Sequence, residues 1–181
     1  MNMLKKIVFT ALAVATLTST AAGAVRWDRL MFPMKGSSIS ASTGSQNSST
    51  GASSDSQNSS AASEVVRLTN STRTQNGYAA LTEDSALSKA AAVRAREIAS
   101  SFSHTRPSGS SFSSVLSESG VSYRRAGENI ASGQKSASEV VNAWMNSSGH
   151  RANMLSSSYS RIGTASVNVG GTLYWVQLFA D

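Results

Sequence analysis

Residues 172–180 read TLYWVQLFA, and this stretch decides the fold. Its large side chains alternate between the two faces that a β-strand presents, and both faces are apolar. One face carries Tyr174, Val176 and Leu178, and the other carries Leu173, Trp175 and Phe179. A strand that is apolar on both faces must be covered on both sides. The stretch therefore predicts a strand at the centre of a sheet that has helices above and below it.

A second strand is predicted immediately upstream, over residues 160–169. Gly170 and Gly171 separate the two stretches, and a two-residue glycine loop is typical of a tight β-hairpin. The chain therefore ends in an antiparallel pair of strands.

Four helices are predicted before this hairpin. The clearest covers residues 84–100, where apolar side chains recur at helical spacing. Ser136 and Glu139 form a capping box at the start of another helix, which ends by Gly149. The other two are expected over residues 63–77 and 109–119. Helices followed by an antiparallel sheet covered on both faces predict an α+β protein, a three-layer α-β-α sandwich with a central antiparallel sheet.

The N-terminus has the organisation of a secretory signal peptide. Lys5 and Lys6 precede an apolar run over residues 7–17, and small residues follow up to Ala24. This order predicts cleavage after Ala24, so that residues 1–24 are removed and the protein is secreted. The apolar run is shorter than the roughly 20 residues that cross a bilayer, so no transmembrane anchor is expected.

Residues 25–62 are interpreted as a mature N-terminal segment followed by a flexible linker. Residues 25–35 are mixed in character, and two interpretations stay open: a tail left by cleavage, or a segment that docks on the domain or on a membrane surface. Residues 36–62 are rich in serine and poor in apolar side chains, which is typical of a flexible tether. The folded domain is expected over residues 63–181.

Composition excludes several classes of site. The chain has no cysteine, which excludes disulfides, thiol nucleophiles and cysteine-ligated zinc. Its formal net charge of +6 is spread along the chain and favours contact with wall polyanions or lipid headgroups. No basic stripe with interleaved aromatic residues occurs, so nucleic acid is not an expected partner.

The chain has two histidines, His104 and His150, and Glu128 lies between them in sequence. Two imidazoles and a carboxylate that converge at one edge of the sandwich can hold a divalent cation or move protons. The alternative is that each histidine is solvated or simply hydrogen-bonded. Spacing alone does not decide between these interpretations.

Five stretches resemble the CAP superfamily, which includes cysteine-rich secretory proteins, antigen 5 and plant pathogenesis-related 1 proteins. They are FSHTRP (102–107), AGENIASG (126–133), VVNAWMNSSGHRANML (140–155), YSRIGTA (159–165) and YWVQLF (174–179). The resemblance covers residues 63–181 and is greatest to the bacterial, cysteine-free SCP-like branch. It implies the same α-β-α sandwich.

The resemblance also implies a site. The family's cleft carries two histidines and two acidic residues, and this chain matches three of them with His104, Glu128 and His150. The fourth position is Ser147, which is not acidic and would hydrogen-bond instead. The resemblance thus implies that His104, Glu128 and His150 hold a zinc, calcium or magnesium ion, with Glu128 as the candidate base and no other catalytic residue assigned.

Three functions are weighed. The first is a secreted binding module that uses this cleft to engage a cell-wall, lipid or protein ligand. The alternative is a metal-assisted extracellular hydrolase that acts on peptide or cell-wall bonds, and the third is a purely structural domain. The sequence leans toward a binding module and leaves enzyme activity undecided, because the fourth acid is missing. Ser147 or Ser148 paired with His150 is a poor candidate nucleophile, because no G-x-S-x-G stretch is present.

Overall fold

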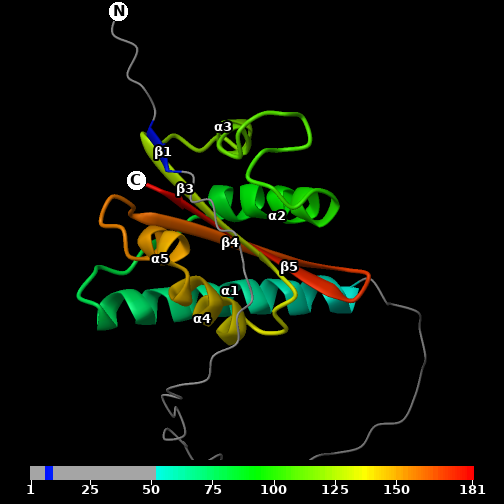
Figure 1. Cartoon of the computed structure of the whole chain (residues 1–181), viewed down its shortest axis with the longest axis horizontal. Coiled ribbons are helices and arrows are strands. Elements are labelled where there is room, and N and C mark those ends of the chain that lie inside the picture. The colour runs from blue at the N-terminus through cyan, green and yellow to red at the C-terminus, as the bar shows by residue number, and fades with distance from the viewer. Residues whose placement is uncertain (1–6, 10–51) are drawn as a thin grey trace, which may run out of the picture.

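β5 forms the centre of a five-stranded sheet whose order is β1-β3-β5-β4-β2 (Figure 1). This computed structural model describes residues 7–9 and 52–181. The strands are β1 (Ile7–Phe9), β2 (Thr82–Glu83), β3 (Arg125–Ser132), β4 (Arg161–Val169) and β5 (Thr172–Ala180). The helices are α1 (Ala52–Gln75), α2 (Ser85–Ser100), α3 (Ser114–Glu118), α4 (Ala137–Asn146) and α5 (Ser148–Met154).

The three long strands are antiparallel, as predicted. β5 pairs with β3 on one side and with β4 on the other. The two short strands pair in parallel, β1 with β3 and β2 with β4, so the complete sheet is mixed. Gly170 and Gly171 turn the β4–β5 hairpin with φ angles of 58° and 81°, which glycine adopts at little cost.

Helices cover both faces of the sheet, which confirms the α+β class. Figure 1 shows α2 and α3 on one side of the strands and α1, α4 and α5 on the other. Val176 and Leu178 of β5 pack into the cluster that contains α2, and Trp175 and Phe179 pack into the cluster that contains α1 and α4. The two apolar faces predicted for residues 172–180 therefore pack into the two cores, one face into each.

Side-chain hydrogen bonds cap the starts of two helices. The Asp84 side chain accepts hydrogen bonds from the backbone N–H groups of Ala86 and Leu87 and caps α2. The Ser136 hydroxyl accepts from the N–H of Glu139 at 3.2 Å, while the Glu139 carboxylate accepts from the N–H of Lys135 at 2.9 Å. Glu139 is thus committed to the start of α4, as the capping box predicted.

The linker prediction was wrong at its C-terminal end. α1 begins at Ala52, so residues 52–62 are helical rather than a flexible tether. Tertiary contacts explain the difference, because Ala61 packs against the core and the Thr164 hydroxyl donates to the Ala62 carbonyl at 2.8 Å. Such contacts stabilise a helix whose own composition is unfavourable. The rest of the predicted linker, residues 25–51, lies outside the described residues.

Most of the predicted signal peptide also lies outside the described residues. The exception is β1, which falls within it and pairs with residues Arg125–Gly127 of β3. Cleavage after Ala24 stays a prediction. Among the described residues, no helix combines the length and apolar character that crossing a membrane requires.

Other boundaries differ from the predictions. β3 was not predicted, because its sequence RAGENIAS contains glycine, glutamate and asparagine, which are poor strand formers. α3 begins at Ser114 rather than at 109, and α4 ends at Asn146. The following segment forms α5, which was not predicted. These corrections matter because β3 and α5 carry two of the candidate site residues.

Candidate functional site

Glu128 lies in the middle of β3 with a fully buried side chain. Arg94 of α2, which is also fully buried, binds both of its carboxylate oxygens. The Nε of Arg94 donates to Oε2 at 2.7 Å and its Nη2 donates to Oε1 at 3.2 Å. A two-pronged contact of this kind fixes the orientation of a carboxylate as well as neutralising it.

His104 completes the coordination of this carboxylate. Its Nδ1 lies 2.8 Å from Oε1 of Glu128, and its side chain is 16% exposed. A carboxylate bound by arginine only accepts hydrogen bonds, so Nδ1 carries the proton. In the neutral imidazole the other nitrogen, Nε2, is then an acceptor.

A second arginine extends the network and holds the segment that carries His104. Glu97 accepts from Arg94 at 2.7 Å and from Arg106 at 2.7 Å. Arg106 also donates to Glu118 at 2.6 Å, and Arg94 donates to the Ser103 carbonyl at 2.7 Å. Burial acts to raise the pKa of Glu97, but the hydrogen bonds from the two arginines outweigh it and hold that pKa below its usual range.

His150 lies in α5 and is electrostatically coupled to His104. Burial lowers the pKa of His150 below its usual value, and the charge of His104 lowers it further. The Asn129 side chain donates to the His150 carbonyl at 3.2 Å and so ties α5 to β3. Both effects favour the neutral form of His150.

A row of buried amides fixes β3 beneath α5. Asn153 donates to the Glu128 carbonyl at 3.2 Å and to the Asn129 side chain at 2.9 Å. Asn129 also donates to Gln177 of β5 at 3.0 Å, and Gln177 donates to the Thr69 hydroxyl of α1 at 2.7 Å. Asn129 therefore links β3 to α5 through the His150 carbonyl and to β5 through Gln177.

Ser147 occupies the junction between α4 and α5. Its hydroxyl makes no capping hydrogen bond, and its carbonyl accepts from the N–H of Arg151 at 2.8 Å. Its place in the cleft stays a prediction. Trp144 and Trp175 are each 1% exposed and belong to the core.

The arrangement does not fit a three-ligand cation site. Both oxygens of Glu128 already accept hydrogen bonds from Arg94 and His104. Within residues 7–9 and 52–181, no three histidine, aspartate or glutamate side chains form a group that could hold a metal ion. Cation binding by His104, Glu128 and His150 stays a prediction.

Sequence reasoning missed Arg94, Glu97 and Arg106. A signal for Arg94 was available, because it falls at helical spacing on the same buried face of α2 as Leu87 and Ile98. An arginine on an apolar helix face requires a buried acidic partner. No such local signal pointed to Arg106, whose partners come from two helices.

Three bacterial proteins resemble this chain in sequence or in fold. The Bacillus subtilis protein YkwD is 42% identical over 118 residues, which are 64% of this chain and 45% of YkwD. The chain thus spans less than half of the length of this relative. The solved structure of an extracellular SCP-domain protein from Bacillus anthracis matches with a TM-score of 0.68 and 23% identity, over 75% of this chain and 45% of that chain. An outer surface protein of Borrelia burgdorferi matches with a TM-score of 0.60 and 23% identity, over 65% of this chain and 89% of that chain.

The family follows from a match that spans most of the folded domain. The two solved structures share the fold of this chain. A protein-family model, CAP: Cysteine-rich secretory protein family, matches residues 66–179 and so spans both cores and the Arg94–Glu128–His104 contacts. The chain is a member of the CAP family of cysteine-rich secretory proteins, although it contains no cysteine.

Proposed function

We propose that the protein is an extracellular binding module that engages a polar component of the cell envelope through His104. Two of the solved structures that share its fold are described as an extracellular protein and an outer surface protein. The formal net charge of the chain is +6, and +4 remains once Lys5 and Lys6 leave with the predicted signal peptide, which favours the anionic polymers and headgroups of such surfaces. The predicted signal peptide supports the same location.

The observation that carries the proposal is the fixed orientation of a partly exposed imidazole. Glu128, clamped by Arg94, holds Nδ1 of His104 at 2.8 Å, and the His104 side chain remains 16% exposed. In the neutral form of this imidazole, Nε2 is then a pre-oriented acceptor for a hydroxyl or amide donor of a ligand. Side chains that are already ordered before binding lose little entropy when the complex forms.

The hydrolase alternative has less support. A general base must be free to take a proton from water or substrate. Both oxygens of Glu128 are engaged by Arg94 and His104, and its side chain is fully buried. The candidate base is therefore held as an anchor for His104, which suits binding better than proton transfer.

Cosedimentation with purified Bacillus subtilis cell walls tests the proposal. We expect wild-type protein to bind and His104→Ala to lose about tenfold or more in affinity, the effect of one well-placed hydrogen bond to a charged or polar partner. His104→Asn is the sharper variant, because its amide can still donate to Glu128 while the Nε2 acceptor is gone. Asn142→Ala, a polar and exposed position on α4, is the control. Wild-type protein that fails to bind walls, or a His104→Asn variant that binds as well as wild type, would refute the proposal.

The predicted cation is tested separately. Titration calorimetry with zinc, calcium and magnesium, on wild type and on a His104→Ala/His150→Ala double variant, measures whether these side chains hold an ion. Heat that the double variant loses would establish the predicted ligands. Equal heats in wild type and the double variant would show that His104 and His150 are not ligands.

A further inference from the structure

The outer edge of β4 has no strand beside it over most of its length. β2 pairs only with Arg161 and Ile162, and beyond them β4 pairs with β5 alone within the described part of the chain. The backbone of Ile162 shows which way the edge groups point, because its carbonyl accepts from the N–H of Asp84 in the β2 direction at 2.9 Å. Backbone groups alternate along a strand, so those of Thr164 and Ser166 face the same open edge.

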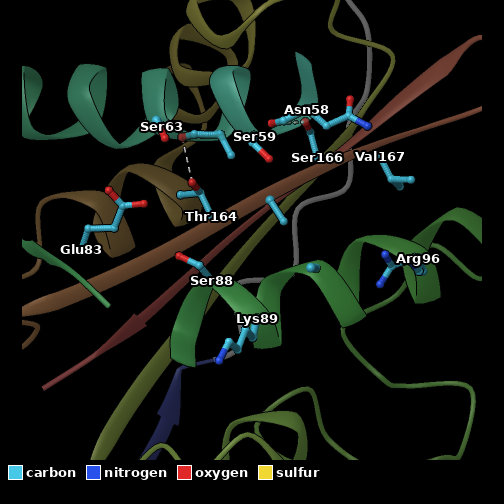
Figure 2. A pocket seen from close by; sticks show the side chains of 13 residues that line it. Asn58, Ser59, Ser63, Glu83, Ser88, Lys89, Arg96, Thr164, Ser166 and Val167 are labelled. Carbon is cyan, nitrogen blue, oxygen red and sulfur yellow. Dashed lines mark hydrogen bonds between the residues drawn. The ribbon is translucent and has the colours of Figure 1, made fainter. Parts of the chain in front are cut away.

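A groove of about 440 Å³ runs along this edge between α1 and α2. Figure 2 shows the two helices on either side of β4, with the side chains of Thr164 and Ser166 directed toward α1. Several of the residues that line it are small, including Ala62 and Ser63 on α1 and Ser88 and Ala92 on α2. Because these side chains are small, another backbone has room to approach β4.

One polar atom in the wall of this groove is left unsatisfied. The Ser88 hydroxyl is buried and, among the described residues, has no hydrogen-bond partner. The Thr164 hydroxyl, by contrast, has a hydrogen-bond partner, because it donates to the Ala62 carbonyl. A buried hydroxyl without a partner costs free energy that a bound polar group recovers.

The groove is basic along α2. Lys89 and Arg96 line it, are exposed, and form no ion pair with any residue that the structure describes. They lie seven residues apart on one face of the helix, which places them about 10 Å apart along its axis. Glu83 lines the opposite end, beside β2. An anionic occupant would therefore be attracted over the stretch between Lys89 and Arg96 and repelled at the β2 end.

We propose that this groove binds an extended acidic peptide, which adds a strand to the free edge of β4. Main-chain hydrogen bonds to Thr164 and Ser166 would supply affinity, and carboxylates two to four residues apart on the side facing α2 would meet Lys89 and Arg96. The open edge selects an extended backbone, and the unpaired cations select its charge. This site is separate from His104 and does not depend on the proposed function.

Fluorescence anisotropy tests the proposal with a labelled eight-residue peptide of alternating glutamate and valine. We expect saturable binding that weakens with added salt, and about fivefold weaker binding by Lys89→Glu and by Arg96→Glu, because each reversal removes one exposed ion pair and adds a repulsion. Lys135→Glu makes the same charge change outside the groove and should bind as wild type does. The same peptide methylated at alternate backbone nitrogens should not bind, because it cannot pair with an edge strand.

NMR spectra locate the peptide. The amide signals of Thr164 and Ser166 should shift on binding, and those of Asn129 should not. Four results would overturn the proposal: no saturable binding, equal binding by the Lys89→Glu variant, equal binding of a lysine–valine peptide, or retained binding of the methylated peptide. Concentration-dependent dimerisation that Lys89→Glu and Arg96→Glu abolish would also overturn it, because the occupant would then be a second copy of this chain.

Discussion

Arg94 and Glu128 are opposite charges whose side chains are both removed from water. Such a pair contributes little net stability by itself, because desolvation offsets most of the attraction between the charges. Its effect here is on position. The carboxylate cannot rotate away from two arginine nitrogens, so the hydrogen bond that it accepts sets the orientation of His104.

Breaking the pair from one side should be costly. We expect Arg94→Met to lower the free energy of unfolding by about 3–5 kcal/mol, because Glu128 would remain buried without its partner. Urea denaturation measures this. Arg67→Met is the control, because Arg67 pairs with Glu64 at 2.6 Å on the solvent-exposed surface, and its loss should lower stability far less. If the two variants lose equal stability, burial of the Arg94–Glu128 pair has no consequence for the free energy of unfolding.

His150 should make stability depend on pH. Burial, and then the charge of His104, lower its pKa below the usual 6.5, so the unfolded chain binds more protons than the folded one as the pH falls below that value. The free energy of unfolding should therefore fall between about pH 6.5 and the lower folded pKa.

Comparison with His150→Gln isolates this contribution. The variant has no imidazole at position 150, so its stability should fall less steeply than that of wild type as the pH is lowered below 6.5. Chemical denaturation at a series of pH values gives both curves. Parallel curves would mean that His150 titrates as it does in the unfolded chain.

Among the helices and strands, the sequence predicted those that have a regular apolar period or a local cap. It missed those that depend on contacts with residues far away in sequence. β5 and α2 were predicted because their apolar side chains follow a regular period, and α4 because its cap is local. β3 was missed because Glu128 and Asn129 resemble loop residues. They are buried in a strand because Arg94 and Gln177, far away in sequence, satisfy them.

The candidate site, too, was predicted only in part. The residues His104, Glu128 and His150 were singled out from the sequence, and the structure places His104 against Glu128. The arginine clamp was not foreseen, because a contact between residues 34 positions apart leaves no local pattern. The start of α1 was misplaced for a related reason, since its first turns depend on contacts with β4.

The contact between α2 and β4 depends on one glycine. A Cβ at Gly163 would lie 2.2 Å from the backbone carbon of Leu87, and backbone cannot move aside cheaply. We expect Gly163→Ala to lower the free energy of unfolding by about 1–3 kcal/mol or more through overpacking.

Thermal unfolding measures the effect of Gly163→Ala, and Gly109→Ala is the matched control. Gly109 has open space around it but a φ of 83°, so its substitution carries a conformational cost of about 1 kcal/mol without a steric one. If the two variants lose equal stability, the close approach of α2 to β4 does not constrain position 163.

For the whole molecule, β5 separates the two proposed binding surfaces. Glu128 and its contact with His104 belong to β3 on one side of β5, and the open edge belongs to β4 on the other. The two cores meet on β5, whose opposite faces carry Leu178 and Phe179. Because one strand belongs to both cores, the domain should unfold as a single unit, and neither surface should survive the loss of the other core.

The predicted export signal determines which residues the exported molecule contains. Lys5, Lys6 and the small residues up to Ala24 predict that protein recovered from the medium of an expressing Bacillus subtilis culture begins at Val25. β1 would then be absent, and Arg125–Gly127 would become an open edge of β3.

Intact-mass spectrometry of the recovered protein gives its first residue. Ala24→Phe should block processing, because the cleavage position requires a small side chain, whereas Ala41→Phe lies beyond the signal and should not. Loss of β1 should leave folding intact, because residues between Ala61 and Ala180 already form two apolar core clusters. The processed protein should therefore unfold in one cooperative transition. Secreted protein that retains Met1, or processed protein that shows no such transition, would instead make β1 a permanent strand of the sheet and residues 1–24 part of the folded domain.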